Sequence, residues 1–221
     1  LSHELRNPIG AISSAVQVLN AQGSSDAATA PVVDILIRQT RHLARLLDDI
    51  LDVARISRGR VVLKIEPVDL RTCVQDAVDG NKQLFADKAH AVSIDMPKEP
   101  VIAEVDCTRV AQVLGNLVNN AAKYSPPQSC IEVAMELRAE EAEILVRDNG
   151  IGIEPHLVPH VFEAFYKTGS AAEGRQGLGV GLWLSRQLIE MLSGEITAHS
   201  EGSGAGSVFR VRLPLHQRNG A

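Results

Sequence analysis

The run Asn116-Leu117-Val118-Asn119-Asn120-Ala121-Ala122-Lys123-Tyr124 closes a helix expected over residues 107–124 and concentrates polar side chains there. Asn is a poor helix former, so three Asn in five residues need a reason. Asn116, Asn120, Lys123 and Tyr124 lie on one helix face. Amide oxygens suit Mg²⁺, and the ammonium of Lys123 suits phosphate. We therefore expect a binding face here; an ordinary solvent-facing helix is the alternative.

Strands and helices alternate on both sides of this helix, which indicates an α/β layer architecture. The order is no regular βαβ repeat, and this disfavours a doubly wound nucleotide fold. The further helices are expected over residues 69–88 and 178–192. The expected strands are Val61–Val68, Val92–Met96, Val101–Val105, Ile131–Leu137, Ala142–Arg147, Glu195–His199 and Ser207–Leu213.

Two amphipathic helices, residues 1–20 and 30–57, precede this region and are joined by a short polar loop. Each carries an apolar stripe at heptad spacing, which predicts an αα-hairpin. Two such helices cannot enclose a core, so a second copy is expected to complete a four-helix bundle. The stripes are Leu5, Ile9, Ile12, Val16 and Leu19 in the first helix, and Leu36, Thr40, Leu43, Leu47, Ile50 and Ala54 in the second.

Composition excludes several classes of function. The 221 residues include 22 Lys and Arg against 27 Asp and Glu, and this net charge of −5 argues against general nucleic-acid binding. No run approaches the roughly 20 apolar residues of a membrane span. Cys73, Cys107 and Cys130 are odd in number and widely spaced, which favours a reducing compartment and argues against a disulfide or zinc framework.

The run Leu1–Pro8 places a histidine on a polar helix face, because His3 points away from the apolar stripe. Glu4 is placed to accept a proton from one ring nitrogen, which leaves the other as a nucleophile. Asn7 lies one turn further along and is placed to position water or a phosphoryl group. An isolated His-Glu pair is more often an ordinary surface pair.

Two glycine-rich runs predict ligand loops. Asp148-Asn149-Gly150-Ile151-Gly152-Ile153 follows a strand, and the carboxylate of Asp148 suits an exocyclic amine such as that of adenine; a simple turn is the alternative. Gly177-Leu178-Gly179-Val180-Gly181-Leu182 starts a helix, where backbone N–H groups bind anions.

The segment before the second run, residues 166–177, reads as a mobile loop that carries Lys167 and Arg175 as phosphate partners. Phe162 and Phe165 either anchor this loop or pack in the core.

These runs, in this order, resemble the sensor histidine kinases of two-component signalling. Residues 1–8 are similar to the H box, 112–124 to the N box, 148–153 to the G1 box, 161–166 to the F box and 177–182 to the G2 box. Gly204–Ser207 resembles a further Gly box. The resemblance implies an α+β chain: a dimerising helical hairpin, then a Bergerat-type α/β sandwich that binds ATP and Mg²⁺.

The resemblance also implies residue roles. His3 is expected to be the phosphoacceptor, Glu4 its acid/base partner, and Asn7 the residue that acts in dephosphorylating a response regulator. Asn116 and Asn120 match the magnesium and phosphate positions, and Asp148 the adenine contact. The other expected nucleotide-binding residues are Lys123, Tyr124, Gly150, Gly152, Ile153, Phe165, Lys167, Arg175, Gly177, Leu178, Gly179, Gly181 and Leu182.

We therefore expect four segments: a dimerisation and phosphotransfer hairpin (1–57), a linker with the first strand (58–67), an ATP-binding domain (68–216) and a tail (217–221). The expected function is an autophosphorylating protein-histidine kinase core that passes phosphate from His3 to an Asp of a response regulator and also dephosphorylates it. The alternatives are an ATPase clamp of the same superfamily and a nucleotide-sensing pseudokinase scaffold. Asn116 disfavours the clamp, because Asn cannot act as a general base.

The expected partners are a second copy of the chain and a response-regulator receiver domain, with no nucleic acid and no membrane contact by this segment. The chain starts at Leu1 without Met, inside an expected helix. We expect a cytoplasmic fragment of a longer protein, whose membrane anchoring is left open.

Overall fold

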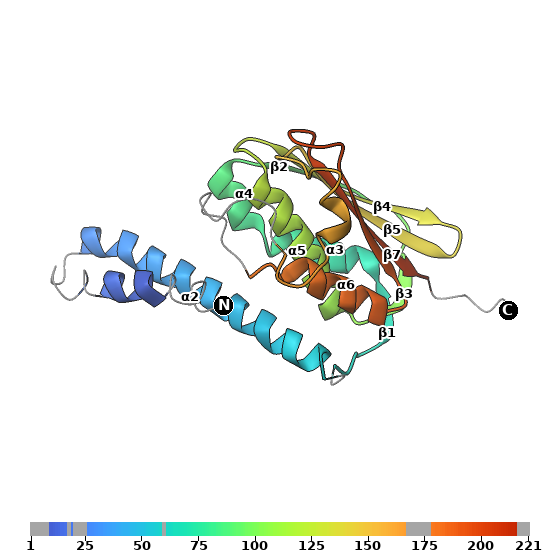
Figure 1. The fold of residues 1–221 in the computed structure, drawn as a ribbon, viewed down its shortest axis with the longest axis horizontal. Coiled ribbons are helices and arrows are strands. Elements are labelled where there is room, and N and C mark those ends of the chain that lie inside the picture. Colours follow the sequence, from blue (N-terminus) through green and yellow to red (C-terminus); the bar gives the residue numbers. More distant parts are fainter. Residues whose placement is uncertain (1–8, 17–18, 20–25, 59–60, 167–177, 216–221) are drawn as a thin grey trace. The chain divides into compact units, whose positions relative to one another are not determined.

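The computed structural model describes residues 9–16, 19, 26–58, 61–166 and 178–215, which fall into two compact units (Figure 1). The first unit extends to Val61 and includes Leu178–Val180, and the second holds the rest of the described chain. Six of the expected site residues, His3, Glu4, Asn7, Lys167, Arg175 and Gly177, lie outside the described residues, as does Leu5 of the first apolar stripe.

Helix α2 (Asp26–Ile56) is the main element of the first unit, and residues 9–16 are also helical. One side of α2 carries a small apolar cluster, in which Leu46 packs with Leu178 and Val180, flanked by Ile50 and Val53. A different stripe is exposed along the same helix: Val33, Ile37, Thr40, Ala44, Leu47 and Leu51. These positions are three or four residues apart, so they form one continuous face.

A five-stranded mixed sheet organises the second unit, in the order β2-β4-β5-β7-β6. The strands are β2 (Ala91–Asp95), β4 (Cys130–Arg138), β5 (Glu141–Asp148), β6 (Glu195–His199) and β7 (Ser207–Pro214). Only the β2–β4 pair of this sheet is parallel. A separate antiparallel pair joins β1 (Glu66–Asp69) to β3 (Ile102–Val105).

Helices α3 (Leu70–Asp79), α4 (Lys82–Lys88), α5 (Cys107–Tyr124) and α6 (Gly181–Met191) lie on one side of the sheet (Figure 1). Alternation along the strands explains the core, because every second side chain faces the helices. Ile144, Val146, Val211 and Leu213 are almost fully buried there, as are Leu114 and Leu117 of α5. The short 3-10 turn η1 (Val158–His160) precedes Phe162.

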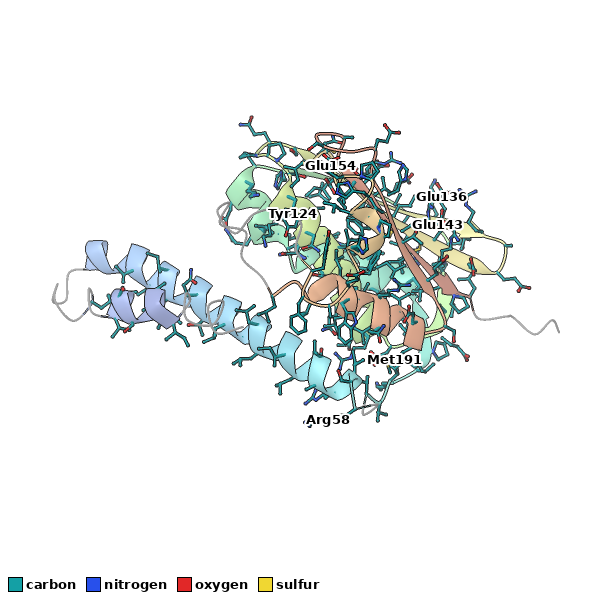
Figure 2. The ribbon with its side chains drawn as sticks, in the orientation of Figure 1. Arg58, Tyr124, Glu136, Glu143, Glu154 and Met191 are labelled. Carbon is teal, nitrogen blue, oxygen red and sulfur yellow. The ribbon has the colours of Figure 1, made fainter. Side chains whose placement is uncertain are left out.

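The opposite sheet face carries charge. Glu143 is buried at the centre of this face, and Arg138, Arg210 and Arg212 approach its carboxylate at 3.9, 3.2 and 2.9 Å. Figure 2 places Glu143 next to Glu136 on the strands. The hydrogen bond from Arg212 lowers the pKa of Glu143, and the positive charges of Arg210, Arg212 and Arg138 add to this effect.

Most expected elements are confirmed, and α5 and β6 have the expected bounds. The helix expected over 30–57 begins four residues earlier, at Asp26. Three further expectations were wrong in extent. The helix expected over 69–88 divides at Gly80 and Asn81, where the Asn81 side chain donates to the carbonyl oxygens of Ala77 and Gly115.

The other two elements are shorter than expected. The strand expected over Val61–Val68 pairs only as Glu66–Asp69, because β3 runs opposite those residues and the N–H of Lys64 binds the Asp106 carboxylate instead. The helix expected from residue 178 begins at Gly181, since Gly179 has a φ of +71°. Among the residues that the structure describes, no helix is long and apolar enough to cross a membrane.

Candidate nucleotide site

Asp148 ends β5, and its carboxylate is held by two residues of the second unit, Gly150 and Ser207. Its Oδ1 accepts a hydrogen bond from the N–H of Gly150 at 2.8 Å, and its Oδ2 accepts from the hydroxyl of Ser207 at 2.5 Å. Ser207 stands opposite Asp148 in the β5–β7 register. The sheet therefore fixes both ends of this contact, and the carboxylate is only 5% exposed.

Burial raises the pKa of Asp148, because removing the carboxylate from water disfavours its charged form. The hydrogen bonds from Ser207 and Gly150 oppose this shift. A buried carboxylate with two fixed donors suits the recognition of one polar ligand group such as an amine.

Two loops beside Asp148, residues 148–153 and 200–206, are joined by hydrogen bonds. The N–H of Gly204 donates to the carbonyl of Ile151 at 2.7 Å, and the N–H of Gly206 donates to the carbonyl of Gly150 at 3.2 Å. The expected site residue Ile153 donates its N–H to the Ser200 hydroxyl at 2.9 Å. The run 148–153 is therefore held in place by residues 200–206.

The glycines of this region leave room for the protein's own backbone. A Cβ at Gly152, which has a φ of +72°, would lie 1.9 Å from the carbonyl oxygen of Gly202. A Cβ at Gly150 would lie 2.7 Å from that of Tyr124, and one at Gly206 would lie 2.0 Å from that of Asp148. Close loop packing thus explains these glycines without a ligand, whereas the sequence had suggested approach to a ligand.

Asn116 lies where α5 meets the start of α6. Its Nδ2 donates to the Ser185 hydroxyl at 3.0 Å, and that hydroxyl donates to the carbonyl of Gly181 at 2.9 Å. The Ser185 oxygen therefore accepts, which fixes the orientation of the amide. Oδ1 points toward Gly181, where a Cβ would lie 2.7 Å from it.

This arrangement fits a hard cation, because the amide nitrogen of Asn116 is already engaged and the oxygen faces the helix start. Asn120 is half-buried one turn further along α5. Among the described residues, His, Cys, Asp and Glu side chains form no group of three that could bind a metal.

Asn119 has a structural role. Its Nδ2 donates to Oδ1 of Asn81 at 3.1 Å and so ties α5 to the start of α4. One of the three clustered Asn residues is therefore explained by packing rather than by a ligand.

Lys123 and Tyr124 end α5, where Figure 2 labels Tyr124. The ammonium of Lys123 lies 5.1 Å from the centre of the Tyr124 ring. The carbonyl of Tyr124 accepts from the N–H of Ile151 at 3.2 Å, so the helix end is tied to the Asp148 loop.

Lys88, which the sequence pattern did not single out, holds this helix end. Lys88 Nζ donates to the carbonyls of Ala122 and Lys123 at 2.9 Å each, and to that of Ser125 at 3.3 Å. His90 Nε2 contacts the carbonyl of Ala122 at 3.0 Å. Terminal helix carbonyls need such donors, but a sequence pattern does not show which distant lysine supplies them. The role of Ser207 as the hydrogen-bond donor to Asp148 was also not predicted, because the sequence showed Ser207 only as the last residue of the run Gly204–Ser207.

The remaining expected residues differ in their surroundings. Leu178 is buried in the α2 cluster of the first unit, and Leu182 is half-buried in α6. Phe162 is in the core, edge-on to Phe209 with ring centres 6.3 Å apart. Phe165 is 64% exposed with a φ of +65°. The two Phe residues therefore differ: Phe162 packs, and Phe165 does not.

Comparison with known proteins gives two family matches. Residues 105–217 match the model of the histidine kinase-, DNA gyrase B- and HSP90-like ATPases, which covers more than half of the chain. Residues 1–59 match the His Kinase A (phospho-acceptor) domain.

Among curated relatives, the histidine-protein kinase AfsQ2 of Streptomyces coelicolor is 32% identical over 97% of this chain, and the sensor histidine kinase MtrB of Mycolicibacterium paratuberculosis is 31% identical over 97%. The chain spans 40% and 38% of those proteins. Among solved structures, the Acinetobacter baumannii histidine kinase AdeS has a TM-score of 0.73 at 22% identity, with 97% of this chain and 98% of that one covered. Its likeness concerns the fold.

Proposed function

Because the chain belongs to the sensor histidine kinases of two-component signalling, we propose that it transfers the γ-phosphoryl group of ATP to its own His3. The observation that carries this proposal is the joint placement, within one unit, of a buried carboxylate at Asp148 and an oriented amide oxygen at Asn116. The first suits the adenine amine, and the second suits the cation that accompanies the phosphates.

In this reaction a ring nitrogen of His3 forms a bond to phosphorus while the bond from phosphorus to the ADP oxygen breaks, and ADP leaves. Glu4 accepts the proton from the other ring nitrogen. Asn116, Asn120 and Lys123 hold the phosphate end of ATP, and Mg²⁺ neutralises phosphate charge when bound. Positioning and charge neutralisation supply most of the catalysis.

We further propose a homodimer through α2. The exposed stripe includes Ile37, Leu47 and Leu51, which are 43%, 47% and 51% exposed. A continuous apolar face on a long helix is costly in water and is usually covered by another protein surface. A second copy of the same face closes a four-helix bundle.

The phosphoryl group then passes to an Asp of a response-regulator receiver domain, and Asn7 acts in the reverse dephosphorylation. The structural neighbour ThkA, which was solved in complex with a response regulator, covers 99% of this chain with a TM-score of 0.70 at 22% identity and supports this proposal through its fold.

The test measures where the γ-phosphate of labelled Mg-ATP goes. A histidine kinase puts label on the protein, whereas an ATPase clamp releases free phosphate and leaves the protein unlabelled. Asn116→Ala should lose the protein label. Free phosphate accumulating with no phosphoprotein would overturn the proposal in favour of the clamp. ATP binding with neither labelled protein nor released phosphate would overturn it in favour of the nucleotide-sensing scaffold.

A further inference from the structure

Two cysteines far apart in the sequence meet in the core of the second unit. Cys73 lies on α3 and Cys107 is the first residue of α5, and their Sγ atoms are 2.6 Å apart. A disulfide bond is about 2.05 Å long, so only a small shift separates the thiol pair from a bond. The spacing in the sequence had argued against disulfides, because it does not show that α3 packs against α5.

We propose that Cys73 and Cys107 form a redox modification site, a thiol pair that hydrogen peroxide converts to an intramolecular disulfide between α3 and α5. This modification does not depend on the proposed kinase function.

The difference in exposure between the two thiols indicates which one reacts first with peroxide. Cys73 is fully buried, whereas Cys107 is partly exposed. Burial, with the neighbouring Cys107 thiol, raises the pKa of Cys73. Cys107 therefore meets the oxidant first, and Cys73 is the resolving residue.

The reaction balances in two steps. The Cys107 sulfur attacks one oxygen of peroxide, which forms a sulfenic acid and releases one water. The Cys73 sulfur then attacks the sulfenic sulfur, and the hydroxyl leaves with the thiol proton as a second water. Two thiols are oxidised and one peroxide is reduced.

Rigid elements hold the pair in register. Helices α3 and α5 pack against each other, and Val74 and Ala77 of α3 and Val110 of α5 are buried. Asp106, which precedes Cys107, caps α5 through the N–H of Arg109 at 3.2 Å and holds the N–H of Lys64 at 3.0 Å. Cys107 therefore has a fixed backbone beside a buried partner, which favours closure of the bond over further oxidation.

The experiment treats the whole chain with hydrogen peroxide, blocks remaining thiols with iodoacetamide and measures the mass of intact and trypsin-digested protein. We expect the peptides 72–82 and 99–109 to be joined, two thiols per chain to be protected from alkylation, and dithiothreitol to reverse both changes. Cys107 carried to sulfinic acid with no joined peptides, or both thiols still open to alkylation, would overturn the proposal.

Cys130 provides the matched control, because it is exposed and free in the same chain. Cys130→Ser should leave the joined peptides unchanged, whereas Cys73→Ser should abolish them. If Cys73→Ser fails to fold, Cys73→Ala serves in its place, since Ala fills part of the same buried volume.

Thermal unfolding gives a second readout. The oxidised Cys130→Ser chain should unfold roughly 5–10 °C higher than the reduced one, because the bond closes a 34-residue separation in the unfolded chain. An oxidised, joined chain that unfolds at a lower temperature than the reduced one would show that the bond forms only by distorting α3 and α5, which overturns the proposed native pairing.

Discussion

At the scale of single residues, Asp148 is the side chain whose environment is most specific. It is buried, it accepts from Ser207 and Gly150, and burial raises its pKa. The sequence pointed to Asp148 because it precedes a Gly-x-Gly turn. It did not point to Ser207 as a partner, because only the pairing of β5 with β7 brings the two together.

Ser207→Ala should weaken the binding of a non-hydrolysable ATP analogue about tenfold, since the carboxylate loses a charge-assisted hydrogen bond worth roughly 1.5–3 kcal/mol. Isothermal titration calorimetry measures the change. Ser203→Ala, an exposed change in the same loop, is the control and should leave the affinity unaltered. Equal affinities for the parent, Ser207→Ala and Ser203→Ala would show that the Ser207 hydroxyl does not contribute to nucleotide binding.

Acidification should weaken nucleotide binding as the pH falls through the raised pKa of Asp148, because a protonated carboxyl is a poorer acceptor for an amine. The contribution of Asp148 to folding stability changes in the opposite direction as the pH falls. Folded Asp148 holds its proton more tightly than unfolded Asp148, so its contribution to stability increases as the pH falls through the same window.

The measurement is the dissociation constant of the ATP analogue as a function of pH, for the parent chain and for Asp148→Asn. The parent profile should contain a step above the ordinary Asp range that the variant lacks, while protonation of the nucleotide affects both chains alike. Parallel profiles would argue that Asp148 does not contact the ligand.

At the scale of elements, periodicity predicted well where one helix face decides burial. Helix α5 has the expected bounds because its apolar face packs and Asp106 caps its start. Periodicity failed where a polar contact interrupts a helix. The side chain of Asn81 divides the helix expected over 69–88, by donating to carbonyls of two different helices. Sequence spacing cannot show such a contact.

The end of α4 stores strain that a single change should relieve. Ala89 has a φ of +53° and a ψ of +37°, a left-handed conformation that glycine adopts more easily. Ala89→Gly should therefore stabilise the chain by about 0.5–1 kcal/mol, as measured by urea unfolding.

Ala86→Gly is the matched control, because Ala86 is exposed within α4. Glycine there should destabilise by about 1 kcal/mol. A loss of stability at both positions would contradict the left-handed conformation of Ala89.

At the scale of the whole molecule, the sequence predicted that the N-terminal helices need a second copy. The exposed face differs from the predicted stripe: Leu36, Leu43, Ile50 and Ala54 are half-buried in the structure. Thr40 and Leu47 belong to both faces, and Ile37 and Leu51 are exposed beside them. The domain bounds and the binding roles of individual residues stay predictions, because they depend on ligands, partners and residues outside the described parts.

Leu47→Glu should shift the chain from dimer to monomer in sedimentation velocity, because a carboxylate would be buried against its own copy in the bundle. Ser57→Glu, an exposed change just beyond the helix, should leave the dimer intact. A Leu47→Glu chain that remains dimeric at the same concentration would exclude this face as the interface.

The most direct test of the account compares the parent chain with His3→Gln and His199→Gln after incubation with γ-labelled Mg-ATP. If His3 is the phosphoacceptor, the parent and His199→Gln should carry phosphate that is lost in acid and retained in base, and His3→Gln should carry none. Equal acid-labile label on His3→Gln would contradict the account, because the phosphoryl group would then be held elsewhere.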